Sequence, residues 1–188
     1  MYKVLVIVVL GLLCIPAMAQ DKLEVFGGYE YLHNGNVTIN GVTAQGSSQG
    51  YNGWNAAATF KFNRLLGVEG DFGGTYATNS GVNLHVYTYT GGPVVTLPTP
   101  IVRPFVHVLF GGMQLTGSES GVSTTFNGFT TMFGGGVDAK VNHFLAIRLG
   151  QVDWLYYHFG SKTIAGTPFP AFSGSNNVRF STGVVLRF

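Results

Sequence analysis

The feature that most constrains the fold of this chain is a period of two in side-chain polarity, which recurs along most of its length. The last eleven residues, VRFSTGVVLRF, place mainly apolar side chains on one face: Val178, Phe180, Thr182, Val184, Leu186 and Phe188. The opposite face includes Arg179, Ser181 and Arg187. Because successive side chains of a β-strand point to opposite faces of its sheet, this stretch predicts a strand with one apolar and one largely polar face.

The same alternation predicts about eight strands, each of roughly ten residues or more. The alternation is clear in the first three segments. In the fourth, fifth and seventh segments, the odd or even position of a residue (its parity) does not assign its side chain to one face of the sheet. No segment shows the period of a helix. The segments are 23–32, 54–62, 66–76, 83–95, 103–115, 126–138, 144–157 and 177–188.

The N-terminus has the organisation of a secretory signal peptide. Lys3 precedes an apolar run over 4–15, and Ala17-Met18-Ala19 offers a small-x-small cleavage site. The run is shorter than the roughly 20 residues that a membrane-spanning helix needs. We therefore expect cleavage after Ala19, which removes 1–19 together with the single cysteine, Cys14, and leaves 20–188 as one exported domain without disulfides.

The charge content of the chain is low for a water-soluble protein. Charged residues make up 10% of the chain and aromatic residues 14%, whereas about a quarter of a typical soluble protein is charged. The chain has 10 Lys and Arg against 8 Asp and Glu, so removal of Lys3 leaves 9 against 8, a net charge near +1. This balance gives no electrostatic basis for binding nucleic acid.

The connections between the predicted strands alternate in length. Long, polar and glycine-rich loops are predicted at 33–52, 116–125 and 158–176, whereas the links at 63–65, 96–102 and 139–143 are short. One further connection, at 78–81, is brief. Long loops on one side and tight turns on the other are typical of an up-and-down barrel in an outer membrane.

A closed barrel also explains the two-faced strands. In hydrocarbon every backbone N–H and C=O must be bonded within the protein, so a sheet can span a membrane only if its first and last strands pair. Lipid then contacts the outer face, which should be apolar, and side chains fill the narrow interior. We therefore predict an all-β fold, an eight-stranded antiparallel up-and-down transmembrane β-barrel that follows a cleaved N-terminal signal peptide.

The sequence resembles the small outer-membrane β-barrel domain family, which includes the transmembrane domain of outer membrane protein A and outer membrane protein X. The resemblance covers the exported chain and rests on six motifs: VFGGYEYL at 25–32, GVEGDF at 67–72, RPFVHVLFGG at 103–112, FGGGVDAKVN at 133–142, AIRLGQVDWL at 146–155 and the terminal VVLRF. It implies residence in the cell outer membrane, contact with outer-membrane lipids, and assembly by the barrel assembly machinery. The terminal residues Phe180, Thr182, Val184, Leu186 and Phe188 resemble the signal that this machinery reads. We expect no peptidoglycan-binding domain after Phe188, and therefore no link to the cell wall.

Charged residues on the predicted inner face form the main candidate site. Isolated charges in a dry lumen are costly unless they are paired. We predict an ion-pair network in which Lys61, Arg148 and Arg179 contact Glu30, Glu69 and Asp71, so that the bore is plugged. Arg148 and Asp153 differ in parity, so a regular strand would place them on opposite faces. Both can face the interior only if a β-bulge lies between them; otherwise one of them lies at the rim. The network either fixes the packing and register of the strands or gates a narrow pore for ions or small solutes.

Aromatic and glycine residues fit the same fold. Ten aromatic residues are expected to lie near strand ends or on the apolar face, as membrane-interface girdles require: Tyr29, Tyr31, Trp54, Tyr76, Tyr87, Tyr89, Phe105, Trp154, Tyr156 and Phe188. Glycine pairs and triples, such as 134–136, fall inside strand segments with no helix to follow them. They therefore favour barrel curvature and room for bulky inner neighbours over nucleotide binding.

The sequence predicts no catalytic residue, cofactor or metal site. It contains no G-x-S-x-G motif, its five histidines (His33, His85, His107, His143 and His158) are scattered, and no His, Cys or Asp spacing repeats at ligand distances. We expect a structural protein, or a recognition protein that binds an extracellular ligand through the loops 33–52 and 158–176. The alternatives are a narrow pore and a lipid-modifying enzyme, for which His107 is the residue to examine.

Overall fold

The computed structural model describes residues 22–45, 50–79, 82–119, 122–164 and 167–188. The expected signal peptide, with Cys14, lies outside these residues. Within them, no helix has the length and hydropathy to cross a membrane. The described strands are β1 (Leu23–His33), β2 (Asn36–Ile39), β3 (Val42–Gln45), β4 (Gly50–Lys61), β5 (Leu66–Asn79), β6 (Val82–Thr96), β7 (Val102–Glu119), β8 (Val122–Lys140), β9 (Leu145–Phe159), β10 (Lys162–Ile164), β11 (Thr167–Phe169) and β12 (Phe172–Arg187).

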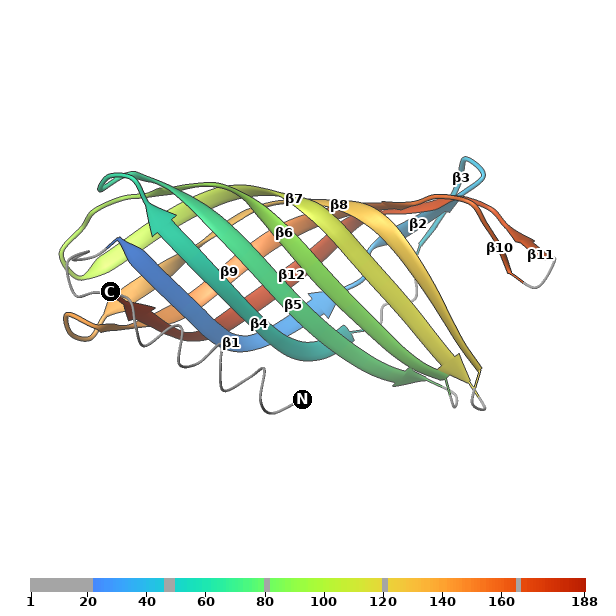
Figure 1. Ribbon diagram of the computed structural model, residues 1–188, viewed down its shortest axis with the longest axis horizontal. Helices are drawn as coiled ribbons and strands as arrows, with labels where there is room; N and C mark the ends of the chain where they lie inside the picture. Colours follow the sequence, from blue (N-terminus) through green and yellow to red (C-terminus); the bar gives the residue numbers. More distant parts are fainter. Residues whose placement is uncertain (1–21, 46–49, 80–81, 120–121, 165–166) are drawn as a thin grey trace.

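Eight of these strands close into an antiparallel barrel (Figure 1). Their order is β1-β4-β5-β6-β7-β8-β9-β12, and β12 pairs back with β1 in a register that sets Tyr29 opposite Thr182. Closure leaves no free edge in the barrel wall, which satisfies the backbone in the absence of water. The predicted eight-stranded up-and-down barrel is confirmed, and each of its strands overlaps one of the predicted segments.

One predicted loop is mostly strand. The segment 116–125 was expected to be a long loop, but β7 continues to Glu119 and β8 begins at Val122. Facing hydroxyl groups support this extension: Thr116 Oγ1 lies 3.0 Å from Thr125 Oγ1, and Ser118 Oγ lies 2.9 Å from Ser123 Oγ. The prediction was wrong here because a polar, glycine-containing stretch can form a strand when its side chains hydrogen-bond across the pair.

The two ends of the barrel differ. At one end lie the β4–β5, β6–β7 and β8–β9 turns and the first and last described residues, where the backbone N–H of Lys22 donates to the carbonyl of Phe188 at 3.0 Å. Two of these turns are fixed by asparagines, because the carboxamide oxygens of Asn63 and Asn142 each accept two backbone N–H bonds at 2.8 Å. We call this the turn end.

The opposite end carries two hairpins that lie in the predicted loops 33–52 and 158–176, and we call it the hairpin end (Figure 1). Strand β2 pairs with both β3 and β12, and β10 pairs with β11. The β2–β3 turn places Asn40 and Gly41 at positive φ, 51° and 79°, as a two-residue hairpin requires. These strands were not predicted, because three or four residues are too few to establish an alternating pattern.

A β-bulge in β9 allows both of its charged residues to face the lumen. Val137 of β8 pairs with Gly150, and Asp138 pairs with Arg148, so Leu149 is an extra residue in β9. Arg148 and Asp153 are therefore both buried in the lumen, while Leu149 lies on the outer face. The sequence required either a bulge or a rim position, and the structure has the bulge.

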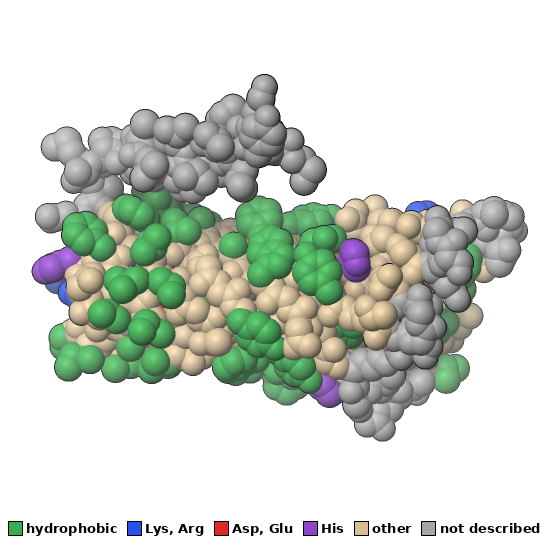
Figure 2. All heavy atoms as spheres, turned by 90° about the horizontal axis from the view of Figure 1, so that it is seen from below, with side chains coloured by type: hydrophobic (Ala, Val, Ile, Leu, Met, Phe, Trp, Pro, Cys, Tyr) green, Lys and Arg blue, Asp and Glu red, His purple; other side chains and the backbone are tan. Residues whose placement is uncertain are grey.

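The outer wall is apolar. Figure 2 shows hydrophobic side chains spread over the visible wall, with Lys and Arg near the ends of the molecule. In β9 exposed residues alternate with buried ones: Ile147, Leu149, Val152, Trp154 and Tyr156 are apolar or aromatic, and His158 follows near the hairpin end. Of the ten aromatic residues expected at the membrane, Phe105 is 6% exposed and faces the lumen, so that prediction was wrong. Its strand is one in which parity was ambiguous.

Candidate functional site in the barrel lumen

The centre of the lumen holds a guanidinium enclosed by three carboxylates. Arg179 of β12 is fully buried, and its Nη1 and Nη2 each lie 2.6 Å from a carboxylate oxygen, of Asp71 and Asp153 respectively. Its Nε donates to Asp153 at 2.7 Å, and Glu30 lies 3.7 Å from Nη1. A buried charge of this kind is tolerated only when it is paired and hydrogen-bonded on most sides.

His107 of β7 extends this central group. Its Nδ1 lies 2.7 Å from Oε1 of Glu69, and its Nε2 lies 2.8 Å from Oδ1 of Asp153. Thr59 donates to Glu69 at 2.9 Å, and Gln151 donates to Asp153 at 2.7 Å. Asp153 therefore joins His107 and Arg179 into one connected network, which we call the central network.

A second group surrounds Arg148. Its Nε donates to Asp138 at 2.9 Å, and its Nη1 donates to Gln151 at 2.5 Å. The guanidinium carbon also lies 4.3 Å from the ring centroids of both Phe26 and Phe105. The two rings and the carboxylate together stabilise a cation that has left water.

A third group lies at the turn end around Glu24. Lys61 donates to its Oε1 at 2.7 Å, Arg187 Nε lies 3.0 Å from the same oxygen, and Arg103 Nη1 lies 3.7 Å from it. The Arg187 contact is an ion pair without hydrogen-bond geometry, since this Nε has no hydrogen-bond partner among the residues that the structure describes.

The structure distributes the six predicted network residues over these three groups. It brings Arg179, Asp71 and Glu30 together, but it places Glu69 against His107. Lys61 contacts Glu24, and Arg148 contacts Asp138, so neither pairs with a predicted carboxylate.

Sequence reasoning missed His107 as a network member. The signal that could have found it is the run Arg103, Phe105, His107 and Leu109, whose members share one parity and are all wholly or largely buried. His107 was examined only as a candidate catalytic residue. Both of its ring nitrogens contact carboxylates, so no ring nitrogen is left to bond a serine hydroxyl.

Glycines on the inner face make room for the central network. A Cβ built on Gly134 would collide with Oδ1 of Asp153 and the backbone oxygen of Val152. A Cβ on Gly73 would lie 2.6 Å from Oε2 of Glu30. These positions support the expectation that strand glycines accommodate bulky inner neighbours.

Between the central network and the hairpin end, buried apolar side chains form one packed cluster inside the barrel. Buried residues from most of the barrel strands pack together there: Leu32, Tyr51, Val86, Leu109, Met113, Met132, Leu155, Tyr157 and Phe159. The rings of Phe159 and Phe172 stack with centroids 4.8 Å apart. We call this group the apolar plug.

The described residues contain no group of three or more His, Cys, Asp and Glu side chains arranged to hold a metal ion. The terminal residues Phe180, Val184, Leu186 and Phe188 are exposed on the outer wall, and Thr182 is half-buried beside them. A role for these five residues in barrel assembly stays a prediction.

Comparison with known proteins places this architecture in a family. No curated protein matches the sequence significantly. Among solved structures, the chain is similar to the attachment invasion locus protein Ail of Yersinia pestis, with 18% identity, a TM-score of 0.53, and 90% and 100% of the two chains covered. It is also similar to Neisserial surface protein A, with 14% identity, a TM-score of 0.60, and 88% and 97% covered. For OprG of Pseudomonas aeruginosa, the identity is 10%, the TM-score 0.54, and the coverage 89% and 96%.

These likenesses show a shared fold. Residues 5–188 also match the outer membrane protein beta-barrel domain, which covers nearly the whole chain. The protein therefore belongs to the outer membrane protein β-barrel domain family and resides in the outer membrane.

Proposed function

We propose that this protein recognises a ligand at the cell surface through the hairpins β2–β3 and β10–β11, and that its lumen is closed. The observation that carries the proposal is the contrast between side chains that pack together inside the barrel and paired hairpin strands that project beyond the barrel wall (Figure 1). Long connections of outer-membrane barrels face the outside of the cell, so the hairpin end is the extracellular end.

The chemistry of the hairpin regions favours an uncharged ligand. The stretches 33–52 and 158–176 contain one lysine, Lys162, and no Arg, Asp or Glu. They expose Ile39, Val42 and Phe169, and Val42 is 72% exposed. Hydroxyl and amide groups next to exposed apolar side chains suit hydrogen bonding and apolar contact rather than charge pairing.

A charged ligand fits these hairpins less well. Ail of Yersinia pestis has been solved in complex with the heparin analogue sucrose octasulfate. A polyanion of that kind is held best by several cations, and Lys162 is alone in the two stretches. We therefore propose that this chain also binds a ligand at the cell surface, but that its ligand is not a polyanion.

Whole-cell binding tests the proposal. Cells that display the protein are applied to surfaces coated with neutral glycans or with heparin, at low and high salt. We expect retention on a neutral glycan that salt does not weaken, and loss of retention in Val42→Asp and in a variant that lacks 161–170. Phe133→Leu on the outer wall is the matched control, and heat-modifiable gel migration verifies that each variant is folded. Unchanged retention by both hairpin variants would refute the proposal.

The closed lumen separates this role from that of a narrow pore. The central network and the apolar plug occupy successive levels of the bore, which opposes a continuous water path. If the lumenal ion pairs of the central network and of the Arg148 group formed a gate, the double substitution of Glu69 and Arg148 by alanine would create or change a current across a planar bilayer. We expect the current of this variant to stay near zero.

We also infer that the protein is not an enzyme. Support comes from His107, the buried histidine that sequence analysis singled out for examination, because both of its ring nitrogens contact carboxylates. Assays for lipid hydrolysis and acyl transfer with wild type and His107→Gln test this inference, and activity that the substitution abolishes would contradict it.

A further inference from the structure

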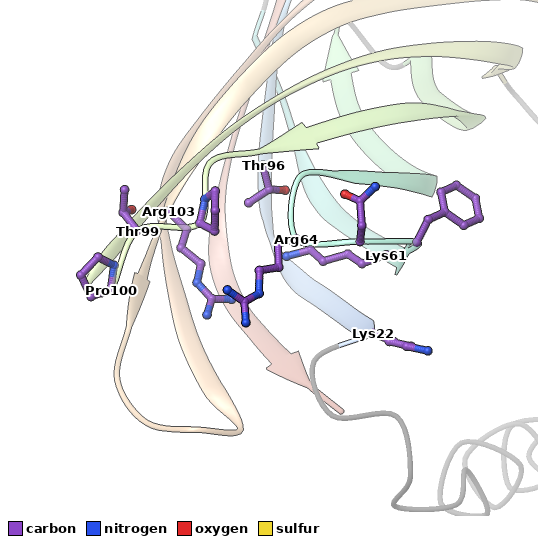
Figure 3. Close-up of a pocket in the computed structure, with 10 residues that line it drawn as sticks. Lys22, Lys61, Arg64, Thr96, Thr99, Pro100 and Arg103 are labelled. Carbon is purple, nitrogen blue, oxygen red and sulfur yellow. The ribbon is translucent and has the colours of Figure 1, made fainter.

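Basic side chains gather around a pocket at the turn end, far from the hairpins. The pocket has a volume of about 590 Å³ and lies between the β4–β5 and β6–β7 turns (Figure 3). Among the described residues that line it, four are cations, Lys22, Lys61, Arg64 and Arg103, and none is a carboxylate. We call these four residues the basic mouth.

The basic mouth has more positive charge than its neighbours neutralise. Glu24 is shared by Lys61, Arg103 and Arg187, at 2.7, 3.7 and 3.0 Å. Asp138 lies 4.0 Å from Arg187 but is hydrogen-bonded to Arg148. Within the described residues, three cations therefore depend mainly on one carboxylate. Cations withdrawn from water without full compensation are unfavourable, so an external anion would stabilise this region.

Unused hydrogen-bond donors point to the same conclusion. Nε of Arg103 is buried and lacks a partner among the described residues, and Nη1 of Arg187 is in the same situation. Arg187 is 2% exposed. A buried guanidinium N–H without an acceptor costs free energy. A tetrahedral oxyanion offers several acceptor oxygens to the N–H groups of a guanidinium.

The pocket also borders the membrane. Phe62 and Pro98 line it together with the cations. Leu65, Leu97 and Ile101, in the same two turns, are exposed by 47%, 52% and 69%. Apolar side chains beside cations at the rim of a barrel match the boundary between acyl chains and headgroups.

We propose that the basic mouth binds a phosphate group, with the guanidinium groups of Arg64 and Arg103 and the ammonium of Lys61 as its ligands. Figure 3 shows Arg64 and Arg103 extending toward a common space across the mouth, whereas Lys22 points away from it. The phosphate belongs either to a free anion in the periplasm or to a phospholipid headgroup of the inner leaflet. This site is independent of the recognition role proposed for the hairpins.

The first test uses the full exported chain refolded in octyl glucoside, which contains no phosphate. Two-dimensional ¹H–¹⁵N NMR follows the backbone amides and the arginine Nε–H groups during titration with inorganic phosphate. Chloride at equal ionic strength is the reference. We expect saturable shifts confined to residues 61–64 and 96–103, including the Nε–H of Arg103. In Arg103→Gln the affinity should fall at least about tenfold. Lys162→Gln, which removes one positive charge at the other end, should bind as wild type does.

The second test distinguishes the two sources of phosphate. Protein extracted from phosphatidylglycerol nanodiscs into octyl glucoside is examined by native mass spectrometry. A retained lipid that is lost in Arg103→Gln and kept in Lys162→Gln identifies the headgroup as the ligand. Phosphate shifts without a retained lipid identify a free anion. The proposal is overturned if neither signal appears, if chloride reproduces the shifts, or if Arg103→Gln behaves as wild type.

Discussion

Nη1 of Arg179 lies 2.6 Å from Oδ1 of Asp71, although 108 positions separate the two residues in the sequence. Strands β12 and β5 are not neighbours in the barrel wall, since β1 and β4 lie between them. The pair therefore spans part of the lumen and joins strands that no backbone ladder connects. Through Asp153 of β9, the same guanidinium also ties a third strand into the network.

Arg179→Met should destabilise the barrel by about 3–5 kcal/mol, because Asp71, Asp153 and Glu30 would remain buried without their cation. The free energy of unfolding in urea, measured in lipid vesicles, checks this. Lys162→Met is the control, since exposed charges contribute about 1 kcal/mol or less. Equal effects of the two substitutions would show that the central network is energetically unimportant.

His107→Leu should also destabilise the fold, by about 3 kcal/mol or more, since Glu69 and Asp153 each lose a buried hydrogen-bond partner. The comparison variant is His143→Leu, in the exposed turn between β8 and β9, which should unfold at nearly the wild-type urea concentration. A His107→Leu variant as stable as wild type would contradict the assigned hydrogen bonds.

Gly134→Ala should cost about 1–3 kcal/mol, because the new methyl group would push against the carboxylate of Asp153. Gly27 offers a matched position in another strand, where a Cβ would have no atom of the described part of the chain within 4 Å. Gly27→Ala should therefore change the free energy of unfolding by about 0.5 kcal/mol or less. If both variants unfold alike, the inner glycines do not serve to accommodate the network.

Val152→Arg should destabilise the membrane-inserted barrel by about 2–4 kcal/mol, because Val152 is 53% exposed near the middle of β9, where arginine would meet hydrocarbon. Val42→Arg, at the projecting β2–β3 hairpin, should have little effect. Unfolding in vesicles measures both, and tolerance of arginine at Val152 would mean that this face does not contact lipid.

The architecture was predictable because a period of two reports directly which side chains share a face. Alternation around Glu30, around Lys61, and around Glu69 and Asp71 correctly assigned these four charges to the interior. The requirement to close the sheet then supplied the pairing of β12 with β1. Where parity was ambiguous, as in β7, the facing of Phe105 was predicted incorrectly.

Ion-pair partners were harder to predict, because parity gives the face of a residue but not its level along the bore. Strand stagger and the bulge at Leu149 set these levels, and they place Arg148 beside Asp138 rather than Glu69 or Asp71. The two hairpins escaped prediction because their strands are short and acquire their conformation through pairing with each other and, for β2, with β12.

The most direct test of the proposal that the lumen is closed is the conductance of planar lipid bilayers that contain the purified wild-type protein. Heat-modifiable migration before reconstitution establishes that the barrel is folded. Because side chains of the central network and the apolar plug pack together inside the barrel, we predict no steady current above that of the bare bilayer. A reproducible, stepwise ion current from the folded wild-type barrel would contradict this account.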